Sequence, residues 1–190
     1  DEFTSAVQHC VDENGDFHFE AWAEEGVPRV DPLWLLKYLP NMPASHIAIY
    51  NDLRGPNNSI TLRQASSNLA LAEAFCTISR GAADALLAGA TGTRVHPLRT
   101  LHVIMQEQVS TESTDANAAC RPFDRDRSGL VVGEGAGCLM LEELDHARSR
   151  GAQILAEVAG YGSSTVVSRD GKPRGGQAIV NAMRHSLATS

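Results

Sequence analysis

The thiols and imidazoles of this chain are spaced in a way that argues against metal chemistry. The sequence contains four cysteines and seven histidines. The cysteines form no C-x-x-C pair, and no histidine pair stands four residues apart beside a carboxylate, which are the spacings typical of zinc sites. We therefore expect no metal, no other cofactor and no disulfide framework. The four cysteines are Cys10, Cys76, Cys120 and Cys138.

A second group of reactive side chains lies where a helix is predicted to begin. Ser66 and Ser67 open this stretch, and Arg63 precedes them. A serine needs a positioned base to become nucleophilic, and none is visible here, so we expect the two serines to be helix caps. Cys76 lies three turns along the helix, where we expect an inert packed thiol. Arg63 is expected to pair with an acidic group, with phosphate or carboxylate binding as the less favoured alternative.

The elements around that helix start predict a layered α/β fold. The β-branched run Ser59–Leu62 predicts a buried strand, and Ser66 to Arg80, closed by Gly81, predicts a helix buried on most sides. The continuous apolarity of Asp84–Ala90 predicts a strand covered on both faces. Further predicted elements are strands over Gly133–Glu142 and Ile154–Gly160 and helices over Phe19–Glu25, Leu144–Arg150 and Gly175–Leu187.

Composition narrows the range of partners. The chain has 190 residues, of which 43% are hydrophobic, and a net charge of −7. This length and apolar content predict one packed core, and the acidic balance argues against binding to nucleic acid or anionic lipid. No apolar run is long enough to span a bilayer, and the first residues lack the pattern of a signal peptide. We therefore expect a soluble, cytoplasmic protein whose partners are small molecules or proteins.

Four blocks of sequence, taken in order, carry a resemblance to a known family. The blocks are Leu39–His46, Gly55–Ile60, Arg121–Gly129 and Gly133–Gly137. Four ordered blocks at matching spacing are far more specific than one glycine motif. With these blocks the chain resembles, from about Pro32 to Leu187, the β-ketoacyl-acyl-carrier-protein synthases, the condensing enzymes of fatty-acid and polyketide synthesis.

This resemblance implies a thiolase-like αβαβα fold, in which helices cover a mixed sheet, and a protein that is usually a homodimer. The matched region corresponds mostly to the N-terminal half of such a protein. We therefore expect residues 1–31 to form a surface insertion with short helices, and residues 32–190 to form a partial N-terminal half of a ketosynthase domain.

Gln64 stands where the resemblance implies the nucleophilic cysteine of the family. A carboxamide has no ionisable proton and cannot accept an acyl chain as a thioester. We therefore expect a homologue that does not perform cysteine-dependent condensation. One interpretation is decarboxylation of malonyl groups on a carrier protein, with the amide imitating the acylated cysteine. A second is a catalytically silent subunit similar to the chain-length factors, and a third is that Gln64 simply caps the helix.

The resemblance also implies two histidine blocks and a lysine in the second half of the family's chain. Neither block occurs in Gly160–Ser190. Decarboxylation is therefore expected only if a longer parent protein supplies those histidines, and catalysis is not expected if the chain is complete.

The stretch Pro97–Ser110 corresponds to the family's acyl pocket and carrier-protein entrance. Within it Leu101, Val103 and Ile104 are candidates for an apolar wall that binds the acyl chain, and they serve equally well as core residues. A basic residue that would contact an acidic carrier is replaced by the run Met105–Gln108, which weakens the case for docking on this surface. The resemblance nevertheless implies an acyl-carrier protein or acyl thioester as partner, and a homodimer or a heterodimer with an active ketosynthase.

The charged loop Arg121–Gly129 contains three arginines and two aspartates. Because the opposite charges offset one another, we expect a solvated, ion-paired loop and not a docking patch.

Overall fold

The computed structural model describes residues 2–112 and 115–190. Two compact units divide the chain, the first ending at Ser59 and the second beginning at Ile60. Among the described residues, no helix combines the length and the apolarity needed to cross a membrane.

The first unit is a set of short helices held by aromatic side chains. Phe3 packs against Trp22 and Trp34, with ring centroids 5.6 and 5.5 Å apart. The predicted helix over Phe19–Glu25 is confirmed as a short α-helix that continues into a π-helical turn. The helical elements are α1 (Glu2–Gln8), α2 (Phe19–Ala21), the π turn Trp22–Gly26, the 3-10 turns Val27–Arg29 and Trp34–Lys37, and α3 (Met42–Tyr50).

Two of the sequence blocks that carry the resemblance are hydrogen-bonded to each other in this unit. The side-chain amide of Asn57 donates to the carbonyl oxygen of Ala44 at 3.2 Å, and the hydroxyl of Ser59 donates to that of Pro40 at 3.1 Å. These bonds join the loop after α3 to the loop and first turn that begin α3. The polar residues of both blocks therefore fix the path of the backbone.

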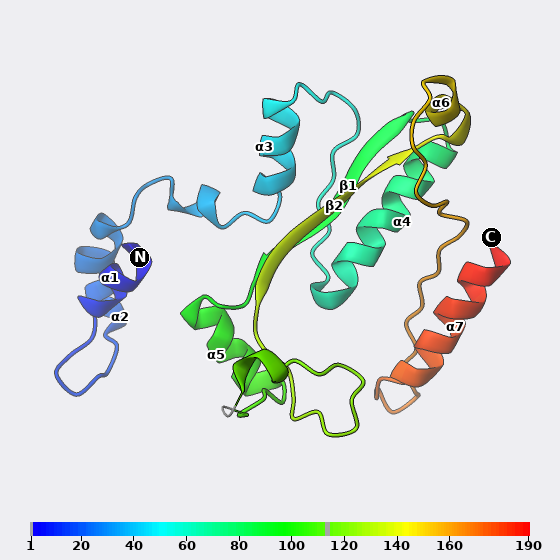
Figure 1. Ribbon diagram of the computed structural model, residues 1–190. Coiled ribbons are helices and arrows are strands. Elements are labelled where there is room, and N and C mark those ends of the chain that lie inside the picture. The colour runs from blue at the N-terminus through cyan, green and yellow to red at the C-terminus, as the bar shows by residue number, and fades with distance from the viewer. Residues whose placement is uncertain (1, 113–114) are drawn as a thin grey trace. The chain divides into compact units, whose positions relative to one another are not determined.

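The second unit contains a two-stranded sheet with one long helix, α4, lying along it (Figure 1). The predicted helices over Leu144–Arg150 and Gly175–Leu187 are confirmed, each with its end within one residue of the expected position. The elements are the 3-10 turn Arg63–Ala65, α4 (Ser66–Ser79), β1 (Ala85–Thr93), α5 (Pro97–Gln106), the 3-10 turn Ala116–Ala118, β2 (Glu134–Glu142), α6 (Leu144–Ser149) and α7 (Gly175–Ala188).

The core of this unit lies between α4 and one face of the sheet. Strands β1 and β2 are antiparallel, and Leu86 pairs with Leu141 in their register. Ala74 of α4 is buried against Ala88 and Leu141, which are 5% and 8% exposed. Small residues at these positions let the helix approach the sheet closely, so the mostly apolar composition of α4 is explained by this contact.

Glycine allows the two strands to pair where a side chain would collide. A Cβ atom built on Gly89 would lie 2.6 Å from the Cα of Cys138 and would also meet the carbonyl oxygen of Gly137. The confined glycine belongs to β1, whereas a Cβ atom on Gly133, Gly135 or Gly137, in the glycine-rich run that leads into β2, would meet nothing within 4 Å.

Two helix ends are closed by glycine in the left-handed region. Gly81 has φ +69°, and the amide of the following Ala82 donates to the carbonyl of Thr77 at 3.1 Å. Gly151 has the same φ, and Ala152 donates to Ala147 at 2.9 Å. The turns at these glycines satisfy carbonyls at the ends of α4 and α6, and the first of them, Gly81, closes its helix as the sequence predicts.

The sheet is smaller and less covered than the sequence predicts. The predicted strands Ser59–Leu62 and Ile154–Gly160 are wrong in this structure, because both segments are irregular. A strand requires a hydrogen-bonded neighbour, and the described sheet consists only of β1 and β2. The prediction that Asp84–Ala90 is covered on both faces is also wrong, since Leu87 of β1 and its partner Met140 are 42% and 58% exposed.

Candidate functional site

The start of α4 is shaped by a tight turn with one strained residue. Arg63, Gln64 and Ala65 form a 3-10 turn that leads directly into Ser66, the first residue of α4. Arg63 has φ +49°, a left-handed conformation that costs a residue with a side chain about 1 to 2 kcal/mol. The turn places Gln64 at the mouth of the helix, where the sequence predicts it.

Ser66 fixes the chain as it enters this turn. Its hydroxyl oxygen accepts a hydrogen bond from the backbone amide of Leu62 at 2.6 Å. The hydroxyl therefore has a structural role close to the predicted one, although it binds the preceding backbone and not an amide of the first helical turn. Among the described residues, no base is recorded beside Ser66 or Ser67, and no acidic partner is recorded for Arg63, so the predicted ion pair of Arg63 is not formed.

The side chain of Gln64 is held by a residue 43 positions further along the chain. Its Nε2 atom donates to Oε1 of Glu107 at 3.2 Å. The same carboxylate oxygen accepts from Nη1 of Arg94 at 3.4 Å. The side chains of Arg94 and Glu107 are 31% and 32% exposed, so this ion pair is partly shielded from solvent.

Backbone bonds hold both partners of Gln64 in place. The amide of Arg94 donates to the carbonyl of Gly133 at 2.9 Å, and the carbonyl of Arg94 accepts from the hydroxyl of Thr100 at 2.6 Å. The amide of Glu107 donates to the carbonyl of Val103 at 2.8 Å, so Glu107 is fixed to the end of α5. We name the three side chains of Gln64, Arg94 and Glu107 the amide cluster.

No thiol lies in the turn that opens α4. Cys76 is ten residues after Ser66 along α4, which is roughly 15 Å along the helix axis. It is half-buried, and its side chain is hydrogen-bonded to Tyr161, which raises the pKa of the tyrosine hydroxyl. Cys10 belongs to the first unit, and Cys120 and Cys138 are exposed in other segments. The predicted packed role of Cys76 agrees with this position.

The predicted acyl-wall residues all lie on α5, with different exposures. Val103 is buried at 8% exposure, whereas Leu101 and Ile104 are 51% and 57% exposed. Among the described residues, no three His, Cys, Asp or Glu side chains gather closely enough to hold a metal ion. The exposed fractions separate Val103, which packs inside the unit, from the two residues that remain free to contact another molecule.

The charged loop Arg121–Gly129 is exposed over most of its length and pairs with itself, except at Arg121, whose Nε atom is buried and has no hydrogen-bond partner within the described residues. Arg125 lies 3.5 Å from Asp126, and Arg127 donates to the backbone carbonyl of Asp124 at 2.9 Å. Phe123, at φ +66°, is fully exposed. The loop therefore has the solvated, ion-paired character that the sequence predicts.

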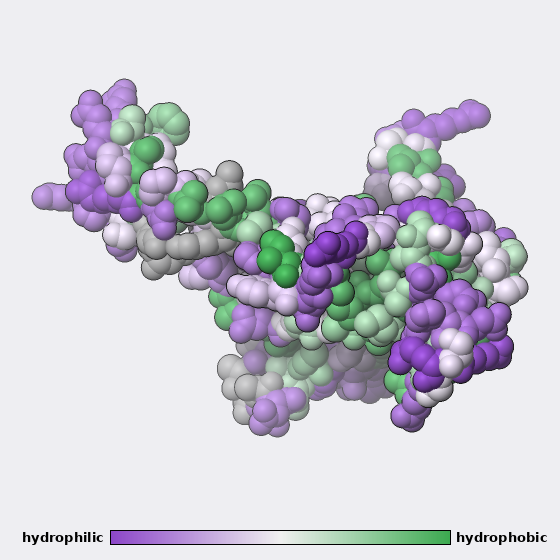
Figure 2. Space-filling view, turned by 90° about the horizontal axis from the view of Figure 1, so that it is seen from above, coloured by the Kyte–Doolittle hydropathy of each residue, from purple (hydrophilic) through white to green (hydrophobic). Residues whose placement is uncertain are grey.

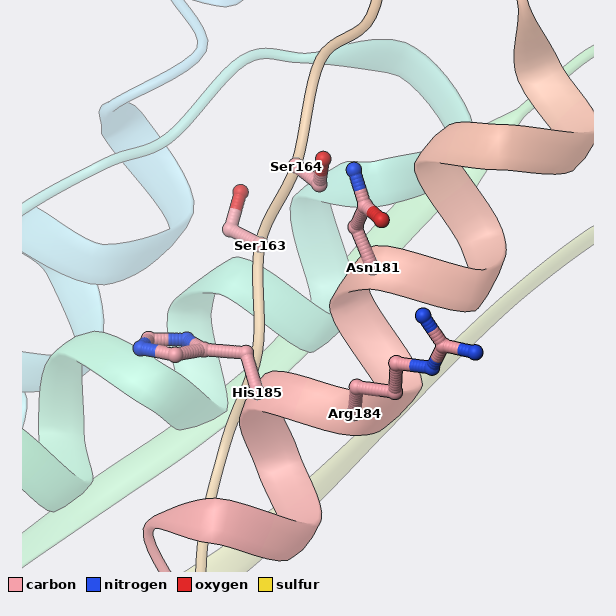
Figure 3. A pocket seen from close by; sticks show the side chains of 5 residues that line it. All are labelled: Ser163, Ser164, Asn181, Arg184 and His185. Atoms are coloured by element: carbon pink, nitrogen blue, oxygen red, sulfur yellow. The ribbon is translucent and has the colours of Figure 1, made fainter.

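A concavity of about 460 Å³ lies between α7 and the irregular segment that precedes it. Ser164 and Asn181 point toward one another there, whereas Arg184 points away from the segment (Figure 3). The ring of His185 contacts that of Tyr161, with centroids 6.3 Å apart. This concavity contains no paired acid and base, so the amide cluster is the better candidate for the functional site.

Sequence reasoning identified Gln64 but missed Arg94 and Glu107. The run Met105–Gln108, which contains Glu107, stands out in the sequence only because it lacks the basic residue expected to contact a carrier protein. No sequence spacing predicts that Glu107 reaches Gln64, since the contact depends on how α5 follows β1.

Comparison with known proteins gives the class of this chain. Residues 10–147 match the family model described as "Beta-ketoacyl synthase, N-terminal domain". The 3-oxoacyl-[acyl-carrier-protein] synthase 2 of Rhizobium meliloti is 38% identical over 156 residues, which cover 78% of this chain and 37% of the relative. The chain belongs to the β-ketoacyl synthase family and corresponds to part of the N-terminal half of its thiolase-like α/β fold.

Two solved structures are similar over almost the whole chain. A type II polyketide synthase acyl-carrier protein in complex with its ketosynthase bound to the hexaketide matches at a TM-score of 0.77 and 26% identity, covering 98% of this chain and 44% of that one. The ishigamide ketosynthase/chain length factor matches at a TM-score of 0.67 and 27% identity, covering 99% and 42%. The chain thus spans less than half the length of these relatives.

Proposed function

We propose that this chain is part of a β-ketoacyl-acyl-carrier-protein synthase homologue that does not form a cysteine thioester. The observation that supports this is the carboxamide of Gln64 in the turn that opens α4, a helix start that offers free backbone amides to a nucleophile or an oxyanion in this family. Cys76, the cysteine nearest in sequence, lies far along the helix. Residue 64 is thus proposed as the position of the family's nucleophile.

The reaction that best suits a carboxamide at this position is decarboxylation of a malonyl group carried as a thioester. The bond between the carboxylate and the α-carbon breaks, carbon dioxide leaves, and the electron pair forms a thioester enolate. The enolate then takes a proton to give acetyl-carrier protein. Amide groups at the helix start would stabilise the enolate oxygen, while Gln64 occupies the place of an acylated cysteine.

The test is incubation of the full-length protein with malonyl-loaded carrier protein, followed by mass spectrometry of the carrier. We expect acetyl-carrier to form, and Gln64→Ala to slow its formation at least about tenfold, because alanine no longer fills the place of the acylated cysteine that shapes the site for the transition state. Ser67→Ala is the matched control near the same helix start. Formation of acetyl-carrier no faster than the uncatalysed background would exclude decarboxylation.

A second candidate function is a silent subunit paired with an active ketosynthase. It is favoured by the similarity to a ketosynthase/chain length factor over 99% of the chain. In that case the protein should form a stable complex with a cysteine-bearing relative from the same organism, and should leave malonyl-carrier unchanged. Size-exclusion chromatography of the two co-expressed proteins measures the first property.

The partner proposed for either function is an acyl-carrier protein, and the proposed assembly is a homodimer or a heterodimer with an active ketosynthase. The segment proposed to belong to the ketosynthase domain is residues 32–190, with residues 1–31 as a surface insertion. Leu101, Val103 and Ile104 are proposed as the wall that contacts an acyl chain. Of these, Leu101 and Ile104 are sufficiently exposed to do so in the described unit.

A further inference from the structure

The carboxylate of Glu107 accepts a hydrogen bond from the side chain of Gln64. Oε1 of Glu107 lies 3.2 Å from Nε2 of Gln64 and 3.4 Å from Nη1 of Arg94. An ionised carboxylate only accepts hydrogen bonds, whereas a carboxamide presents both a donor end and an acceptor end. Glu107 therefore selects the orientation in which the NH₂ group of Gln64 faces it and the amide oxygen is turned away.

The same carboxylate would oppose an anion at residue 64. A thiolate is the reactive form of a cysteine, and a neighbouring negative charge raises the pKa of a thiol by disfavouring that form. A neutral carboxamide carries no such penalty and gains a hydrogen bond to a charged acceptor, which is stronger than one between neutral groups. The carboxylate of Glu107 is thus favourable to glutamine at residue 64 and unfavourable to an ionised cysteine there.

We propose that Glu107 is a positioning residue that adapts this site to a carboxamide, so that the departure from a nucleophile involves Gln64 and Glu107 together. Arg94 holds the carboxylate in place and partly neutralises it. The inference rests on the proposed function in one respect, which is that residue 64 occupies the nucleophile position. It adds that restoring a cysteine at this position does not by itself restore a normal thiolate.

Other charged groups near the site do not reverse this expectation. Arg63 is the chain neighbour of Gln64, and the first turn of α4 contains no acidic residue. Helix α5 also carries Arg99 and His102. Cationic side chains and the start of α4 favour a thiolate, so they act against Glu107. These cationic groups and the start of α4 remain unchanged when Glu107 alone is replaced, so the replacement isolates the effect of the Glu107 carboxylate.

The experiment measures the introduced thiol of Gln64→Cys in the full-length protein by its rate of alkylation with iodoacetamide from pH 6 to 10. Peptide mass spectrometry distinguishes this thiol from the four native ones. The profile is compared between Gln64→Cys alone and the same variant combined with Glu107→Gln, which keeps the side-chain shape. We expect the combined variant to have a lower midpoint pH, with a thiolate fraction at pH 7 about three- to tenfold higher at low salt.

Two further variants control the result. Gln64→Cys with Arg94→Ala should move the midpoint in the opposite direction, because the carboxylate loses its counter-charge. Gln64→Cys with Glu157→Gln, which removes an exposed carboxylate from the irregular segment after α6, should leave the midpoint unchanged. Circular dichroism verifies that each variant is folded.

The proposal is overturned if Glu107→Gln moves the midpoint no more than Glu157→Gln does. If Glu107→Gln unfolds the protein, the Arg94→Ala comparison decides alone, and an unchanged or lowered midpoint there contradicts the proposal. Alkylation requires neither carrier protein nor turnover, so failure of the decarboxylation assay leaves this test intact. Conversely, a positive alkylation result without acetyl-carrier formation would count against the proposed reaction only.

Discussion

At the scale of single residues, Gln64 shows how one side chain changes the chemistry open to a helix start. The turn that presents it is intact, with Arg63 in a left-handed conformation and Ser66 bonded to the backbone of Leu62. A backbone that retains strain of this kind is expected where a specific geometry has to be held. The turn therefore presents a carboxamide, which has no nucleophilic atom at neutral pH.

Exposure of the Gln64→Cys variant to an acyl-carrier thioester tests whether residue 64 faces an acyl-binding pocket. We expect a covalent adduct with the mass of the acyl group, because a thiol at the start of α4 can accept an acyl chain by thioester exchange. Wild-type protein is the control and should show no adduct at this residue. Absence of the adduct in a folded variant, at a pH where the introduced thiol is ionised, would contradict the assignment of residue 64 to the nucleophile position.

A second residue-scale feature is the carboxylate of Glu142 at the end of β2. Arg150 donates two hydrogen bonds to it, from Nε at 2.7 Å and Nη2 at 2.6 Å, and Nδ1 of His146 lies 2.6 Å from Oε1. The bonds from Arg150 lower the pKa of Glu142 to about 2, with a smaller contribution from His146. This ion pair ties α6 and the residue after it back to the sheet.

Glu142 should therefore stabilise the protein in a pH-dependent way. A carboxyl group with a lowered pKa in the folded state contributes stability above its ordinary pKa of 4.5, and that contribution is lost as the pH falls from 4.5 toward about 2. We expect Glu142→Gln to lower the urea midpoint at pH 7, and the difference from wild type to shrink steadily as the pH falls from 4.5 toward about 2. Asp145→Asn, at a highly exposed carboxylate of α6, is the control and should change little at either pH.

At the scale of elements, the pairing of β1 with β2 leaves no room for a side chain at one glycine of β1 and leaves room at another. A Cβ at Gly89 would collide with the backbone of β2, whereas one at Gly92, three residues along the same strand, would meet nothing within 4 Å. The two positions are otherwise similar in sequence. Only the paired structure distinguishes them.

Gly89→Ala should accordingly destabilise the protein, and Gly92→Ala should not. For Gly89→Ala we expect a loss of about 1 to 3 kcal/mol in the free energy of unfolding, typical of overpacking that forces backbone shifts. For Gly92→Ala we expect a change within about 0.5 kcal/mol. Urea denaturation followed by circular dichroism gives both values. Equal effects of the two substitutions would show that the strands do not pair in this register.

At the scale of the whole molecule, the chain leaves much apolar surface exposed. On the side of the sheet opposite α4, Leu87 and Met140 face each other across the strands and are 42% and 58% exposed. Figure 2 shows a broad hydrophobic area bordered by hydrophilic residues on the face that it draws. Exposed apolar patches of this kind mark surfaces that bind other protein or cause aggregation.

This exposed face predicts a measurable property of the 190-residue chain expressed alone. We expect it to increase the fluorescence of the apolar dye ANS, and Leu87→Ser with Met140→Ser to reduce that increase by about half or more while improving solubility. Ala88→Ser is a control on the covered face, which should instead destabilise the protein because Ala88 is 5% exposed. Unchanged dye binding in the double variant would mean that this face is not accessible.

The sequence by itself determined the elements whose signals are local. The apolar stretch ending in Gly81 predicts α4 to within a residue, and the four ordered blocks predict the family that the comparisons confirm. The strand predicted at Ser59–Leu62 failed because β-branched composition is a local signal, whereas a strand also requires a partner strand that the described part of the chain does not provide.

Only the tertiary structure decided what surrounds Gln64. Its contact with Glu107 joins residues 43 positions apart, and Arg94 reaches the same carboxylate from the end of β1. Such contacts depend on the path of the chain through α4, β1 and α5, and no periodicity or motif in the sequence encodes that path directly. The sequence therefore determined which side chain occupies the start of the helix, and the fold decided which charge lies beside it.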